Sequence, residues 1–208
     1  MCSAGFATLL TVYNPSFEEP ALADGGAVGY TGGASSPPYW LSAGTTQVLH
    51  QDHPSTGGLR ATDGSQYAYI FSGGVLQQGA WFIEANTVYT ATVDLATVTA
   101  LSPEYAWSWV GFYVDPDGEP FTTLNVEKFG WNSLGTGNLN TEIPTNQFGT
   151  FSVSWDSTGS SYVGEVLILR FQSDRVYYDN VRMEAVPEPA TLAILGLGGV
   201  MSLMRRRK

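Results

Sequence analysis

The 208-residue sequence contains a single cysteine, Cys2, so no disulfide can form within the chain. Cations are also scarce: Lys and Arg together number nine, and ahead of the C-terminus they form no basic stripe. Nucleic-acid phosphates need such a stripe, so no nucleic-acid partner is expected. No G-x-S-x-G motif is present, and Cys2 lies too near the chain end to be a positioned nucleophile. These absences predict a protein that is not an enzyme.

The acidic charge lies ahead of the last 23 residues. The whole chain carries a net charge of −10, and residues 186–208 hold four cations and one carboxylate, a net +3, so residues 1–185 carry −13. This part is also rich in glycine, tyrosine and tryptophan. Such a composition is typical of exported, β-rich domains rather than of cytoplasmic enzymes.

The C-terminus has three parts in a fixed order. A rigid turn comes first, then Ala190 to Met204 without a charge, then a basic stop of Arg205, Arg206, Arg207 and Lys208. The turn consists of Val186, Pro187, Glu188 and Pro189. Proline lacks an amide N–H, so a strand that precedes the turn should end there. The apolar part would span about 22 Å as a helix, whereas a bilayer core needs about 30 Å, which favours a transient membrane helix with its cations on the cytoplasmic side.

Residues 186–208 closely resemble the PEP-CTERM sorting signal of Gram-negative bacteria. The resemblance implies that the Pro-Glu-Pro element is recognised by an exosortase, a membrane-embedded cysteine protease that cleaves nearby. It also implies export, transient anchoring in the inner membrane, and release to the cell surface or extracellular matrix, often together with extracellular polysaccharide. An ordinary anchor that is never cut is the alternative.

The N-terminus lacks the basic segment and apolar run of a signal peptide. Gly5-Phe6-Ala7 nevertheless has the small-x-small form of a signal-peptidase site. We therefore expect residues 1–7 to be the remnant of a signal peptide and the mature chain to begin near Thr8.

Between residues 8 and 185, almost every ordered stretch has the pattern of a β-strand. Thr87–Thr99 alternates, with Tyr89, Ala91, Val93 and Leu95 on the face expected to meet a core. Residues 66–71 and 75–84 flank Gly73-Gly74 and predict a hairpin, while residues 23–38 predict a Gly/Ser/Pro-rich loop. No amphipathic helix precedes Pro187. About nine strands predict a single all-β domain over residues 8–185, an antiparallel jelly-roll sandwich followed by one short C-terminal membrane helix.

Three short motifs resemble those of galactose-binding-like jelly rolls, which include many carbohydrate-binding modules. They are N-P-S-F-E at Asn14–Glu18, D-G-S-Q-Y-A-Y at Asp63–Tyr69 and Y-Y-D-N-V-R-M at Tyr177–Met183. The resemblance implies that the first and last strands are neighbours and that Glu18 and Asp179 hold a structural Ca²⁺. Asp63, or a carbonyl beside it, would supply a further oxygen ligand. The alternative is that Glu18 caps a loop and Asp179 pairs with an arginine.

The strand at residues 107–115 carries the candidate ligand site. Trp107, Trp109 and Tyr113 share one face, because side chains alternate along a strand. The opposite face carries Ser108, Val110, Phe112 and Val114. If the aliphatic-rich set is the core, the three aromatics form an exposed row that could stack on sugar rings. The alternative buries the tryptophans and turns Ser108 outward, since large aromatic side chains dominate cores.

The sequence thus predicts an exported, exosortase-sorted, non-catalytic surface or matrix protein that binds extracellular polysaccharide. A structural envelope or biofilm component without a glycan site is the main alternative. An ice-binding protein and a secreted glycan hydrolase rank behind it. His50 and His53 have H-x-x-H spacing but no evident third ligand, so surface histidines are expected rather than a zinc site.

Overall fold

The computed structural model describes residues 7–31, 37, 39–99, 106–115, 133–138 and 143–188. Several predictions fall outside these ranges: most of the signal-peptide remnant, Pro189, the membrane helix Ala190 to Met204, and the basic stop. Among the described residues, no helix has the length and apolar character needed to cross a membrane.

The described chain is almost entirely β-structure. The strands are β1 (Thr8–Leu10), β2 (Ala27–Thr31), β3 (Leu41–His50), β4 (Gln66–Phe82), β5 (Thr87–Ala96), β6 (Trp107–Asp115), β7 (Ser133–Asn138), β8 (Gly149–Asp156), β9 (Val166–Asp174) and β10 (Val176–Pro187). One 3₁₀ turn, η1 (Pro54–Thr56), interrupts the loop between β3 and β4. The prediction of an all-β chain is confirmed.

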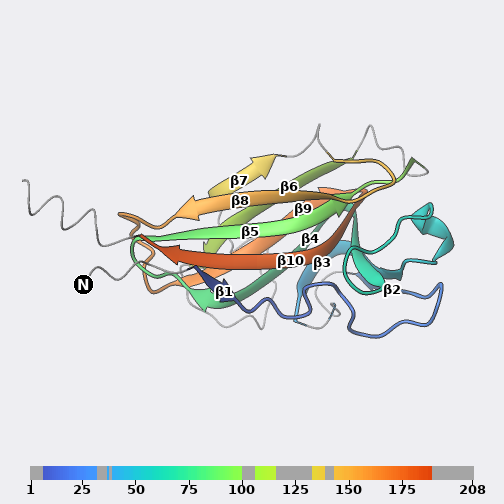
Figure 1. Ribbon diagram of the computed structural model, residues 1–208, viewed down its shortest axis with the longest axis horizontal. Coiled ribbons are helices and arrows are strands. Elements are labelled where there is room, and N and C mark those ends of the chain that lie inside the picture. The colour runs from blue at the N-terminus through green and yellow to red at the C-terminus, as the bar shows by residue number, and fades with distance from the viewer. Residues whose placement is uncertain are drawn as a thin grey trace, which may run out of the picture.

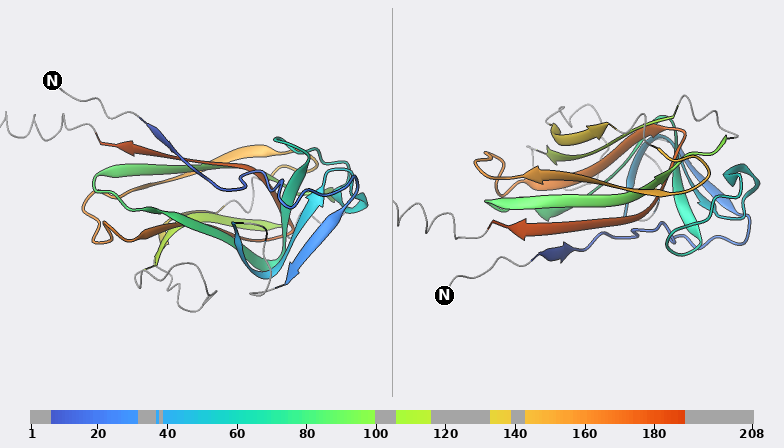
Figure 2. Two further views of the ribbon diagram at one scale, coloured as in Figure 1. Left: turned by 90° about the horizontal axis from the view of Figure 1, so that it is seen from below. Right: turned by 45° about the horizontal axis from the view of Figure 1, so that its top comes forward.

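The strands form one antiparallel sheet that folds into two layers. Its order is β7-β6-β9-β4-β10-β5-β8, with β3 beside β4, β2 beside β3 and β1 beside the end of β10. One layer holds β8, β5 and β10 and the other holds β7, β6 and β9, as the edge-on view in Figure 2 shows. The strands of both layers run roughly along the long axis of the molecule (Figure 1). The first and last strands are neighbours, since Thr8 pairs with Ala185.

The predicted hairpin at Gly73-Gly74 is wrong, because β4 continues through it. The first part of β4 pairs with β10, where Ile70 lies opposite Val176, and the second part pairs with β9. Ser72 and Gly73 adopt φ angles of 58° and 73°, which bend the strand instead of reversing it. A Cβ on Gly74 would lie 2.8 Å from a β3 carbonyl oxygen, so the close approach of the two strands needs glycine here. The bend takes β4 from one layer into the other.

The predicted loop over residues 23–38 is also partly wrong. It contains β2, whose Ala27 and Thr31 pair with β3 at Leu49 and Thr45. Neither β3 nor β7 was anticipated, because both carry several Gly, Ser or Thr residues and lack a strong apolar alternation. These strands owe their conformation to ladder pairing with stronger neighbours.

The main core lies between the layers. Tyr89, Ala91, Val93 and Leu95 of β5 face it, as their alternation predicted, and meet Leu169 and Phe171 of β9 among others. A second, smaller core lies on the outer side of the β10 layer beneath the β3–β4 loop. There the rings of Tyr69 and Tyr177 stack with centroids 4.7 Å apart. Full burial of each such side chain contributes roughly 1.5–3 kcal/mol.

The last strand ends where the prolines predicted. β10 includes Val186 and Pro187, which pair with Val88 and Thr87 of β5. The amide of Glu188 then donates a 2.7 Å hydrogen bond to the carbonyl of Asn86. The first three residues of the sorting motif are therefore part of the folded sandwich.

Candidate functional site

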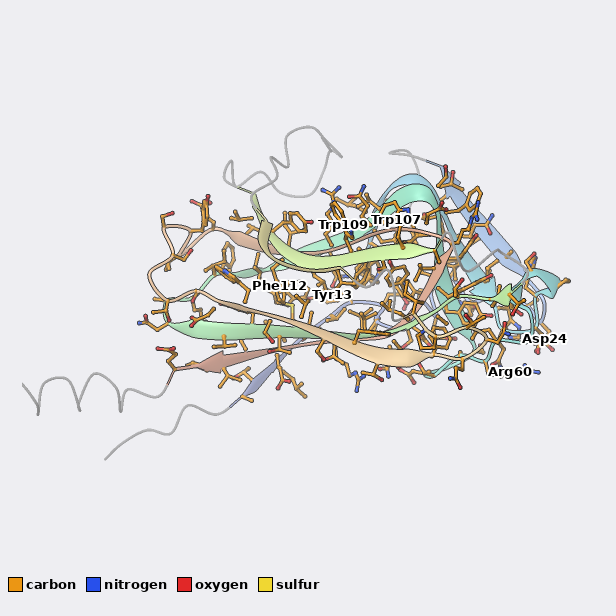
Figure 3. The ribbon with its side chains drawn as sticks, turned by 90° about the horizontal axis from the view of Figure 1, so that it is seen from above. Tyr13, Asp24, Arg60, Trp107, Trp109 and Phe112 are labelled. Carbon is orange, nitrogen blue, oxygen red and sulfur yellow. The ribbon has the colours of Figure 1, made fainter. Side chains whose placement is uncertain are left out.

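Strand β6 turns its aliphatic face inward and its tryptophans outward. Phe112 and Val114 are fully buried in the core between the layers, and Ser108 is fully buried as well. Burial of this hydroxyl is possible because it shares a 2.6 Å hydrogen bond with the hydroxyl of Tyr178 on β10. Figure 3 shows Trp107 and Trp109 on the side of β6 opposite to Phe112. The alternative in which Ser108 faces solvent therefore does not hold.

The predicted aromatic row is only partly accessible. Trp107 and Trp109 meet edge to face with ring centroids 6.1 Å apart, and Trp109 keeps 36% of its surface exposed. Tyr113 is only 5% exposed, and the guanidinium carbon of Arg170 lies 5.3 Å from the centroid of its ring. Two indoles are thus available for stacking on a ligand, whereas the ring of Tyr113 packs against the guanidinium of Arg170.

Strand β9 places Arg170 and Gln172 beside these aromatics. Ladder pairing sets Gln172 opposite Trp109 and Arg170 opposite Gly111, so that these four residues share the outer face with Tyr113. Arg170 is 7% exposed, and its Nη2 donates a 3.2 Å hydrogen bond to Oε1 of Gln172. Burial lowers the pKa of Arg170 from its ordinary value, while the nearby Tyr113 opposes the change.

The guanidinium of Arg170 is incompletely satisfied. Its Nε finds no hydrogen-bond partner in the part of the chain that the structure describes. In the part of the chain that the structure describes, the arginine–carboxylate pairs involve Arg60, Arg175 and Arg182, not Arg170. A buried cation without a carboxylate is unusual, because the cost of desolvating it is normally offset by a partner.

The predicted calcium ligand Glu18 holds a turn. Its Oε1 accepts hydrogen bonds of 2.7 Å from the amides of both Ser65 and Gln66, and its Oε2 accepts one of 3.2 Å from the Ser65 hydroxyl. Gly64 lies directly against this carboxylate, since a Cβ there would be 2.3 Å from Oε1. The loop-capping alternative describes this geometry.

Asp179, on β10, binds the residues just ahead of this turn. Its Oδ2 accepts hydrogen bonds from the Thr62 amide at 2.6 Å, the Thr62 hydroxyl at 2.9 Å and the Asp63 amide at 3.1 Å. The carboxylate of Asp63 turns away and accepts a 2.7 Å hydrogen bond from Ser16. Burial raises the pKa of Asp179 to about 7, and the donors from Asp63, Thr62 and Asn180 only partly oppose this rise.

The carboxylates of the three predicted calcium ligands all accept hydrogen bonds. Amides reach Oε1 of Glu18 and both oxygens of Asp179, and a serine hydroxyl reaches Asp63. In the described residues, the carboxylate and imidazole group that brings three possible ligand atoms within 4.8 Å of one another is Asp24, His50 and Asp52. Calcium at Glu18, Asp63 and Asp179 therefore stays a prediction.

The group around His50 is not a convincing metal site either. Nδ1 of His50 accepts hydrogen bonds of 3.2 Å from the amides of Gly25 and Asp52. A neutral imidazole then carries its proton on Nε2, which lies 3.6 Å from Asp24, so neither ring nitrogen has a free lone pair. The ring is buried because it ties two loops together, and the prediction that His50 is a surface residue is wrong.

Comparison with known proteins now assigns the chain to a family. Residues 8–184 match the HpiC1-like family, described as HpiC1 cyclase, and residues 185–208 match the PEP-CTERM protein-sorting motif. The chain belongs to the HpiC1-like family. Its C-terminal PEP-CTERM motif implies export and transient membrane anchoring. No curated protein matches the sequence.

Solved structures similar to this HpiC1-like chain share its fold at low sequence identity. An apo cyclase from Fischerella sp. is 20% identical, with a TM-score of 0.66, and the match covers 87% of this chain and 97% of that one. The Stig cyclase Fisc from Fischerella sp. TAU, in complex with (3Z)-3-(1-methyl-2-pyrrolidinylidene)-3H-indole, is 21% identical, with a TM-score of 0.65 and coverage of 88% and 99%. A tandem CBM22 domain from Paenibacillus barcinonensis Xyn10C is 12% identical, with a TM-score of 0.50 and coverage of 91% and 49%.

Sequence reasoning identified the two tryptophans of the outer face but missed Arg170 and Gln172. Both lie on β9 in an apolar strand, V-L-I-L-R-F-Q-S-D, where a lone arginine is easily taken for a residue with an exposed end. Alternation along β9 puts both on one face, but only the pairing of β9 with β6 brings them beside the tryptophans of this HpiC1-like chain.

Proposed function

We propose that this chain is an exported, non-catalytic surface or matrix protein that binds extracellular polysaccharide on the outer face of β6 and β9. The observation that carries the proposal is the pair of outward-facing indoles, Trp107 and Trp109, on a rigid central strand. An isolated exposed aromatic needs no explanation, but two neighbouring indoles on one face mark a surface suited to a partner.

The surroundings of the indoles suit a sugar. Indole faces offer apolar area to the C–H face of a pyranose, and nearby polar groups fix the orientation of its hydroxyls. Gln172 lies opposite Trp109 and supplies an amide for this purpose. Since β6 pairs with strands on both sides, the tryptophans stand on a backbone that is held in place before the ligand arrives.

Binding should be measured on an array of bacterial polysaccharides and then by titration calorimetry. Trp109→Ala and Trp107→Ala are expected to weaken binding at least about tenfold each, as central aromatic contacts do. Phe82→Ala is the control, because Phe82 is exposed but lies at the end of β4. Binding that survives both tryptophan substitutions would exclude this face. A protein that binds no glycan would support the structural-component alternative.

Processing of the tail by an exosortase is the second part of the proposal. The motif at Val186 to Pro189 would be recognised while Ala190 to Met204 occupies the inner membrane. Intact-mass measurement of the extracellular protein should then find a chain that ends near Pro189. Detection of Arg205 to Lys208 on that protein would support a permanent anchor instead.

A catalytic role is the second candidate, because the family is described as HpiC1 cyclase. One residue favours it: the carboxyl of Asp179 has a pKa raised to about 7 by burial, a value suited to proton transfer near neutral pH. Against it, Asp179 is fully buried and bonded to the turn at residues 62–63. Tight binding of the indole compound found in the Fischerella complex would support the catalytic candidate, whereas its failure to bind would favour the non-catalytic proposal.

A further inference from the structure

Resting on the proposed glycan-binding function, we infer that the ligand of the outer face is acidic and that Arg170 receives a uronate carboxylate. Nothing in a neutral polysaccharide would require a buried cation beside the indoles.

The guanidinium of Arg170 has a donor without an acceptor among the described residues. A guanidinium remains charged at all ordinary pH values and carries five N–H donors. One donor reaches Oε1 of Gln172, and the ring of Tyr113 supports the planar group from one side. Among the described residues the Nε donor has no acceptor, although Arg170 is only 7% exposed. Among the described residues, no carboxylate forms with Arg170 the bidentate pair that a guanidinium makes best.

Arg170 lies near the indoles on the outer face of β6 and β9. Along β9, Arg170 is two residues from Gln172, so it lies about 7 Å further along the sheet than the Trp109–Gln172 pair. On the β6 side its partner across the ladder is Gly111, which has no side chain to compete for the guanidinium, and on the β4 side its partner is Gln77. A sugar stacked on Trp109 could therefore direct a substituent toward Arg170 and accept a hydrogen bond from Gln172 on the way.

The ligand group that best matches a guanidinium is a carboxylate. A carboxylate is planar and accepts two parallel N–H bonds from guanidinium, a geometry that a hydroxyl cannot reproduce. A neutral sugar would leave the Nε donor unpaired, so the site would discriminate against it. The net charge of −13 on residues 1–185 repels a polyanion at long range, which slows association but does not cancel a short-range ion pair.

The test compares charged and neutral forms of the same sugars. The probes are oligogalacturonate, oligomannuronate and hyaluronan fragments, each beside its carboxyl-reduced form, together with a sulfated oligosaccharide. We expect the wild-type protein to bind at least one uronate about tenfold or more tightly than its carboxyl-reduced form. Arg170→Met should abolish this preference and Arg170→Lys, which keeps the charge but loses the fork, should reduce it. Arg60→Gln, on the exposed loop between β3 and β4, is the control and should leave it unchanged.

Each outcome separates the two proposals. Equal binding of charged and reduced forms, or a preference that Arg170→Met retains, overturns the acidic-ligand inference while the glycan-binding proposal stands. A stronger preference for the sulfated sugar overturns the assignment to a carboxylate. Failure to bind any glycan, neutral or charged, overturns the proposed function itself. The wild-type comparison needs no variant, so it decides the question even if Arg170→Met does not fold.

Discussion

Asp179 gives the sharpest prediction about stability, because its carboxyl is fully buried yet ionisable. Burial raises its pKa in the folded protein to about 7 from an ordinary value of 3.8. The folded state therefore holds this proton more tightly than the unfolded chain does. The stabilising contribution is complete below pH about 4 and is lost as the pH rises to about 7.

The magnitude follows from the size of the rise. One pKa unit corresponds to about 1.4 kcal/mol. The rise from 3.8 to about 7 thus makes the free energy of unfolding about 4 kcal/mol smaller at pH 8 than at pH 4 through this carboxyl alone. Asp179→Asn replaces the carboxyl by a neutral group of the same shape, so the variant should lack this part of the pH dependence.

The assay is urea unfolding of wild type and Asp179→Asn at several pH values between 4 and 8, in the presence of a chelator. The difference between the two proteins should change by about 4 kcal/mol across the range, with the variant gaining as the pH rises. Asp24→Asn, which removes an exposed carboxylate, is the control. A flat difference, or one of opposite slope, would refute the reasoning and show that the amides of Thr62 and Asp63 stabilise the charged form more than burial opposes it.

Adding calcium to the same experiment tests the predicted ion. If calcium binds Asp179, the wild-type protein should gain stability at pH 8, where the carboxyl is ionised, and Asp179→Asn should gain much less. An unchanged midpoint for wild type with and without chelator would remove the ion from the account.

Three further substitutions probe the site and its support. Arg170→Met should change the free energy of unfolding by less than about 1 kcal/mol, because relief of the unpaired donor offsets the lost ring contact; a loss of about 3–5 kcal/mol in urea unfolding would reveal a carboxylate partner. Gly64→Ala should lower the free energy of unfolding, measured by thermal unfolding, by at least about 2 kcal/mol, because its Cβ would meet Glu18. The control Gly58→Ala should lower it by about 1 kcal/mol, because Gly58 also has a positive φ but nothing lies within 4 Å of its Cβ position. Tyr178→Phe should lower the free energy of unfolding by about 1–2 kcal/mol, because it leaves the buried hydroxyl of Ser108 without its hydrogen-bond partner. An unchanged free energy of unfolding would contradict the buried hydrogen bond between Ser108 and Tyr178.

The sequence predicted well where one strand has one buried face. Alternation along β5 identified its core residues, because both neighbours of β5 lie in the same layer. The prediction of a hairpin at Gly73-Gly74 failed, because a pair of glycines indicates a flexible backbone but does not distinguish a bend in a strand from a chain reversal. The bend is set by the strands that pair with β4, which are distant in sequence.

The candidate site was predictable to the same extent. The spacing of Trp107 and Trp109 places them on one face of the strand. The aliphatic residues of the opposite face indicate that this opposite face is the buried one. Burial of Ser108 depends on a hydroxyl partner from β10, and the position of Arg170 depends on the register between β6 and β9. Such cross-strand neighbours are not encoded in any local pattern of the chain.

The attachment of the sorting motif to the sandwich constrains how the protein can be released. Pro187 still pairs with β5 and the Glu188 amide still bonds to Asn86, so only Pro189 separates Glu188 from the apolar segment at Ala190. The two residue steps from Glu188 to Ala190 span at most about 7 Å, roughly the depth of one lipid headgroup layer. If that segment inserts into a membrane, the domain would have to lie against the bilayer surface. If an exosortase cuts at the motif, the last residue pairs of β10 would have to open first, and the stability of those pairs would then limit the rate of release.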